Sequence, residues 1–103
     1  MIAVNELTEG DLREAERCLC LICRKYLITK EELLLPIFRN DFIHQIKGLY
    51  ITYMIQKNHF SYACLSRVLL RDKRTIRYSY KKYSYYVEKM LLDEYNELIE
   101  YLK

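Results

Sequence analysis

Glycine and proline are scarce in this chain, long hydrophobic runs are absent, and each shortage narrows the class of protein. Two glycines and one proline in 103 residues exclude collagen-like and Pro/Gly-rich disordered sequences. The apolar run from Leu33 to Phe38 is broken by Pro36, and no apolar run in the sequence is long enough to span a membrane. Residues 1–10 lack the basic and apolar regions of a secretory signal. We therefore expect a cytoplasmic protein without membrane contact, and the length predicts a single domain over residues 1–103.

The cysteines are few, and their spacing suits a metal site poorly. They are Cys18, Cys20, Cys23 and Cys64. On a helix, Cys18 and Cys20 lie about 200° apart, which is poor geometry for two ligands of one ion. We interpret the thiols as small apolar side chains of a reduced protein, with a metal site or redox pair as the alternative. No metal and no other cofactor is predicted.

Catalytic motifs are missing as well. His44 and His59 have no carboxylate or cysteine at ligand spacing. The sequence holds no nucleophile elbow, paired-carboxylate motif or zincin pattern. We predict that the protein is not an enzyme.

Helical patterns, by contrast, run from end to end. Apolar residues recur at spacings of three and four, and no stretch alternates with a period of two, so we predict an all-α fold of five or six helices. Side chains suited to N-caps are Thr8, Thr29 (with Glu32 as capping-box partner), Asn40, Ser61 and Asp72. The expected helices cover about 8–26, 29–35, 40–57, 61–69, 72–90 and 91–102. Pro36 ends the second helix, and the last is acidic.

Tyrosines crowd the fifth predicted helix, with five between positions 78 and 86. The predicted buried stripe comprises Tyr80, Tyr83 and either Tyr86 or Val87, and the half-exposed rings are Tyr78 and Tyr85. This packing role is favoured because tyrosine joins a large apolar body to a polar tip, and a stacking platform for bases is the alternative. By the same spacing, Leu12 and Phe42 open the predicted buried stripes of the first and third helices.

Positive charge is concentrated in one segment. Residues 67–82 hold seven Lys or Arg and one acid, a net charge of +6 in a chain whose total is +3. The flanks are acidic, since residues 1–32 sum to −2 and residues 83–103 to −3. Such charge on two short helices joined by a turn at residues 70–71 is typical of a helix-turn-helix, and it indicates a polyanionic partner, most often DNA.

The helix after Asp72 carries residues suited to the major groove of DNA. A helix in that groove meets base edges with its first turns and phosphates with flanking basic residues. The exposed early positions are predicted to be Lys73, Arg74 and Arg77, with Lys81 one turn later. Arg and Lys can donate to guanine, and Thr75 can contact a thymine methyl or a phosphate.

The segment from Leu65 to Ile76 resembles the signature of the C-terminal DNA-binding domain, domain IV, of the bacterial replication initiator DnaA. That signature has an apolar residue, two glycines and then Arg-Asp-His-Ser/Thr-Thr-Val. Here Arg71, Asp72 and Thr75 match it, and Ile76 stands in place of Val. Ser61-Tyr62 stands where the family has Ser-Leu, and Arg39, Ile43 and Lys47 fit its upstream basic loop and long helix. The resemblance covers about residues 15–90.

This resemblance implies a Trp-repressor-like fold with residues 71–75 in the major groove. It also implies Arg39 in the minor groove and Lys47 and Lys82 on phosphates. The residues expected to contact DNA are therefore Arg39, Lys47, Ser61, Arg67, Arg71, Asp72, Lys73, Arg74, Thr75, Arg77, Lys81 and Lys82.

Several positions depart from the family. Lys73 and Arg74 replace its base-reading His and Ser/Thr, so the family's target sequence does not transfer. Leu70 replaces the glycine of the turn, and Gly48 replaces a glutamine. No Gly-x-x-x-x-Gly-Lys-Ser/Thr motif is present, so no nucleotide is expected, and the chain is expected to be a free-standing relative of one domain.

The leading prediction is a double-stranded DNA-binding protein of a bacterium, phage or mobile element, acting in replication or transcription control. The alternative is a protein-interaction or regulatory module that keeps the fold but has lost specific DNA binding. In that case the first helix and the acidic last helix would dock a partner protein or a second copy.

Overall fold

The fold is built from α-helices alone in the part of the chain that the structure describes. The computed structural model describes residues 9–34 and 41–103. Its helices are α1 (Glu9–Tyr26), α2 (Lys30–Leu34), α3 (Asp41–Gln56), α4 (Tyr62–Leu69), α5 (Lys73–Lys89) and α6 (Leu92–Leu102). No strand occurs in these residues, which confirms the predicted all-α class. None of the described helices combines the length and hydrophobicity that a membrane span requires.

Local capping explains where three of the helices begin. The Thr29 hydroxyl accepts the N–H of Glu32, and the Glu32 carboxylate accepts the N–H of Thr29, both at 3.0 Å, so the predicted capping box starts α2. The Ser61 hydroxyl accepts the N–H of Cys64 at 3.1 Å and starts α4. Asp72 caps α5 in the same way. The predicted caps Thr8 and Asn40 and the helix breaker Pro36 lie outside the described residues.

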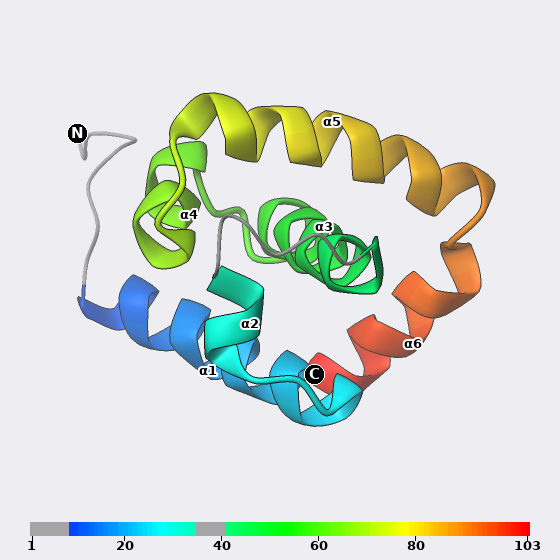
Figure 1. Cartoon of the computed structure of the whole chain (residues 1–103), viewed down its shortest axis with the longest axis horizontal. Helices are drawn as coiled ribbons and strands as arrows, with labels where there is room; N and C mark the ends of the chain where they lie inside the picture. The colour runs from blue at the N-terminus through cyan, green and yellow to red at the C-terminus, as the bar shows by residue number, and fades with distance from the viewer. Residues whose placement is uncertain (1–8, 35–40) are drawn as a thin grey trace.

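Helix α3 passes through the centre of the molecule (Figure 1). It contacts α1, α2, α5 and α6, and every residue from Gly48 to Met54 is buried. The Tyr50 hydroxyl donates to the carbonyl of Ala15, and the Thr52 hydroxyl donates to that of Gly48, each at 2.8 Å. These two buried hydroxyls are thus satisfied, as burial of a polar group requires. Because neighbours enclose α3, its buried surface is wider than a one-sided stripe.

The predictions that Leu12 and Phe42 lie in the core are wrong. Leu12 is 38% exposed and Phe42 is 49% exposed. Each lies in the first turn of its helix, where neighbouring elements cover the helix less than they cover its later turns. Phe42 still meets Tyr26 edge-on, with ring centroids 5.9 Å apart.

Gly48 determines how closely α5 approaches α3. A Cβ at position 48 would lie 2.2 Å from Cδ2 of the Tyr83 ring. Any residue larger than glycine would therefore displace the ring or the helix that carries it. This contact fixes the basic helix on the core.

Candidate nucleic-acid interface

The connection between α4 and α5 is short and is closed by its own hydrogen bonds. Its first residue, Leu70, has a left-handed backbone (φ 55°), and its N–H donates to the carbonyl of Ser66. The Arg71 N–H donates to the same carbonyl at 3.1 Å, and the Ser66 hydroxyl donates back to the carbonyl of Arg71. Asp72 then accepts the N–H of Arg74 at 2.6 Å and begins α5. Both helices and the turn lie where the sequence predicts them.

The outer face of α5 is basic. Its exposed residues up to position 82 are Lys73, Arg74, Thr75, Arg77, Tyr78, Lys81 and Lys82. Ile76 is only 1% exposed and holds the helix on the core. The ion pairs of the described residues lie elsewhere, on Glu14, Glu16 and Glu100, so these cations have no carboxylate partner within the described ranges. Within the described residues, the helix therefore presents exposed cations that form no ion pair.

Three of the predicted DNA contacts have structural roles. Ser61 and Asp72 are N-caps, and their side-chain oxygens are engaged by backbone N–H groups. The guanidinium of Arg71 donates to the carbonyl of Leu34 at 2.7 Å and to that of Leu70 at 3.0 Å. Arg71 thereby ties the turn to the end of α2. These residues shape the basic surface.

Lys47 lies half-buried on α3, close enough to Arg71 to feel its charge. Burial, and then the neighbouring Arg71 guanidinium, lower the pKa of Lys47 to about 8. The two cations thus lie near each other without a carboxylate in an ion pair, within the described residues. Such a pair favours an anion such as phosphate.

The last two predicted contacts are on other parts of the chain. Arg67 is exposed in the final turn of α4. Arg39 lies outside the described residues.

The tyrosines of α5 divide between the core and the surface. Val87 is buried, Tyr80, Tyr83 and Tyr86 are half-buried, and Tyr78 and Tyr85 are exposed. The predicted division is therefore confirmed for the outer rings. The inner rings are less buried than predicted, because they flank the stripe that Ile76 and Val87 centre.

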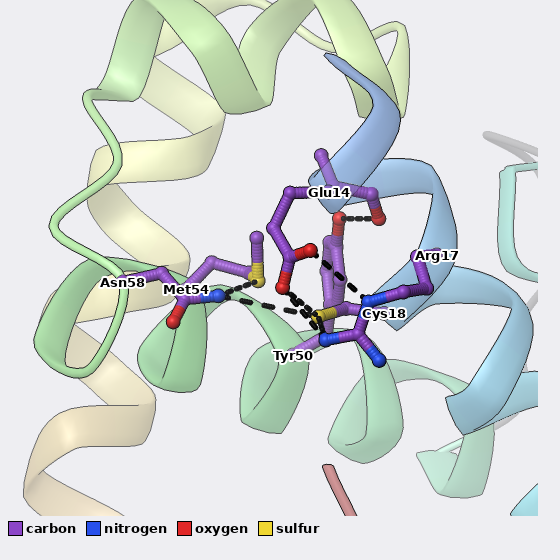
Figure 2. Close-up of polar contacts among 7 residues, drawn as sticks. Glu14, Arg17, Cys18, Tyr50, Met54 and Asn58 are labelled. Carbon is purple, nitrogen blue, oxygen red and sulfur yellow. Dashed lines mark hydrogen bonds and ion pairs between the residues drawn. The ribbon is translucent and has the colours of Figure 1, made fainter. Parts of the chain in front are cut away.

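A polar cluster that the sequence analysis missed joins α1 to the end of α3 (Figure 2). Arg17 donates to both carboxylate oxygens of Glu14, at 2.7 and 3.0 Å. The thiol of Cys18 lies 3.6 Å from the same carboxylate, and the Asn58 amide lies 4.0 Å from the sulfur and 3.5 Å from that of Met54. The spacing of the α1 residues could have indicated their contact. Nothing in the sequence indicates their contact with Asn58, which lies 40 residues after Cys18.

This cluster does not activate the thiol. Burial, and then the charge of Glu14, raise the pKa of Cys18 to about 11, so the thiol is protonated at neutral pH. Cys23 and Cys64 are also buried, Cys20 is exposed, and all four thiols are free. Among the described residues, no three His, Cys, Asp or Glu side chains gather in an arrangement that could hold a metal ion.

Comparisons with known proteins add no further information about this interface. No protein-family model, no curated protein and no solved structure matches the chain.

Proposed function

We propose that this chain binds double-stranded DNA by placing the first turns of α5 in the major groove. The observation that carries the proposal is the exposed basic face of a capped helix that follows a short turn. Arg74 and Arg77 would meet base edges, where guanidinium groups donate to guanine O6 and N7. Thr75 would contact a thymine methyl or a phosphate.

Phosphate contacts would set the register of the helix in the groove. Arg67 on α4 and Lys82 on α5 are exposed for this role. Lys47 would join them, because a phosphate relieves the repulsion between its ammonium group and Arg71. Arg71 and Asp72 would act mainly by holding the turn in shape.

The proposal includes a relationship to domain IV of DnaA, which rests on the sequence resemblance. The order of helices and the capped turn support it. Lys73 and Arg74 replace that family's base readers, so the target would be this protein's own. A role as a regulator or replication factor is the one that we propose.

A duplex titration at low salt tests the proposal with a charge-matched control. Arg74→Ala/Arg77→Ala removes two cations from the face assigned to DNA. Arg13→Ala/Arg24→Ala removes two exposed cations from α1, which lies across α3 from α5 (Figure 1). We expect the first variant to lose about tenfold or more in affinity and the second to change little.

Equal losses in the two variants would mean that only the net charge matters. No duplex binding by the folded wild-type protein at low salt would contradict the proposal. It would leave the protein-interaction module as the better hypothesis.

A further inference from the structure

Aromatic and basic side chains alternate along the exposed face of α5. Arg74, Tyr78, Lys81 and Tyr85 follow one another at spacings of four, three and four residues, so they share one side of the helix. Tyr78 is 68% exposed and Tyr85 is 57% exposed. Core packing explains neither ring.

The Tyr85 ring is supported by other tyrosines of α5. The Tyr85 ring lies 6.0 Å from that of Tyr86, and the Tyr86 ring meets that of Tyr83 edge-on at 5.6 Å. Tyr83 in turn rests against Gly48 of α3. The ammonium group of Lys82 lies 5.5 Å from the Tyr83 ring centre and 5.9 Å from that of Tyr86. A shallow hollow lined by Tyr78, Lys81, Lys82, Tyr85 and Tyr86 results.

The chemistry of this hollow suits unpaired nucleotides. Aromatic rings offer stacking surfaces to any base, and the lysines beside them attract the phosphates that connect the bases. Tyr78 and Tyr85 are seven residues apart, or about 10 Å along the helix, with both lysines between them. Tyrosine alone would also suit a protein partner, but the lysines beside the rings favour a polyanion, because lysine is depleted at protein–protein interfaces.

The position of the hollow on α5 indicates which nucleic acid reaches it. The helix has 17 residues and is about 25 Å long, whereas a helix in the major groove uses mainly its first turns. The later turns therefore extend beyond the base contacts proposed for Arg74 and Arg77, and Lys82 lies where the duplex contacts and the hollow meet.

We propose that the hollow between Tyr78 and Tyr85 binds unpaired bases of a single DNA strand that continues from the bound duplex. This inference rests on the proposed duplex binding. It adds a preference for junctions between double-stranded and single-stranded DNA.

The test compares a blunt duplex, the same duplex with an oligothymidine extension, and the extension alone. The wild-type protein should bind the extended duplex most tightly. Tyr78→Leu/Tyr85→Leu should remove the advantage of the extension, about tenfold or more, and leave blunt-duplex affinity unchanged. Tyr78→Phe/Tyr85→Phe should retain most of the advantage, because stacking needs the ring and not the hydroxyl. Tyr101→Leu, which truncates a partly exposed tyrosine on α6, should behave as wild type.

The chain lacks tryptophan, so tyrosine fluorescence gives a second readout, with quenching expected only when the extension is present. Equal binding of blunt and extended duplex by the wild-type protein would overturn the inference. So would an RNA extension that binds more tightly than the DNA one, or a Leu variant that keeps the advantage. Binding of the extension without any binding of the blunt duplex would refute the proposed function and leave the stacking site in place.

Discussion

At the scale of single residues, Lys47 shows that placing a half-buried cation near a second cation lowers the stability of the fold. Its pKa lies near 8 in the folded protein, against an ordinary 10.5. Between these values the unfolded chain binds a proton that the folded chain has released. The free energy of unfolding therefore rises with pH across this window, and below pH 8 the full cost of the charged Lys47 is present.

Lys47→Met should remove that cost and keep the apolar stem. We expect it to stabilise the protein at pH 7 by on the order of 1 kcal/mol, with a gain that shrinks as pH rises toward 10.5. Urea unfolding of the two proteins at several pH values checks this. The difference between them is the informative quantity, because buried phenols such as Tyr26, whose pKa burial raises to about 12, titrate alike in both. A gain that does not depend on pH would contradict the explanation.

At the scale of elements, the contact between Gly48 and Tyr83 predicts whether replacing Gly48 stabilises or destabilises the protein. Glycine to alanine in an exposed helix ordinarily stabilises. Gly48→Ala should instead destabilise by about 1–3 kcal/mol, because the new Cβ overlaps the Tyr83 ring.

The chain's other glycine supplies the control for this prediction. Gly10 is exposed in the first turn of α1, so Gly10→Ala should be neutral or stabilising. Combining Gly48→Ala with Tyr83→Ser should cost less than the two single changes added together. Thermal unfolding followed by circular dichroism gives all these values. Additive costs would show that the close contact does not govern the packing of α3 on α5.

The helices and their beginnings could be predicted, because capping is local chemistry. Ser61 and Asp72 each bond to N–H groups within three residues, and that pattern is visible in the sequence. The left-handed Leu70 could not be predicted from its own residue type, since leucine disfavours that backbone. The signature that the sequence analysis compared with residues 65–76 has glycine at this position, and only that glycine would have indicated a left-handed backbone.

Contacts between distant residues limited the prediction of the candidate site. Arg71 resembles a DNA contact in sequence, yet its guanidinium bonds to the carbonyl of Leu34, 37 residues earlier. The ring of Tyr83 likewise packs against Gly48, which lies 35 residues earlier. The exposed positions Lys73, Arg74 and Arg77 were predictable, because they follow from the cap at Asp72 and the helical period.

At the scale of the whole molecule, the most basic helix, α5, and the most acidic helix, α6, are different elements. The basic α5 spans much of a molecule that measures 38 × 27 × 24 Å. The acidic residues of the last helix are Asp93, Glu94, Glu97 and Glu100. Positive charge is thus concentrated on the side that α5 forms, which would orient the protein on a polyanion before any specific contact forms.

The salt dependence of binding should count the phosphates that this side contacts. For duplex DNA, the logarithm of affinity falls with the logarithm of salt concentration by about 0.9 for each phosphate neutralised. Lys82→Ala should therefore flatten the slope by about one unit and weaken binding equally for every duplex sequence. Arg24→Ala, which removes an exposed charge from α1, should leave the slope unchanged. Equal flattening of the slope by both variants would mean that charge acts through the overall field of the molecule. In that case α5 would not contact the phosphates directly.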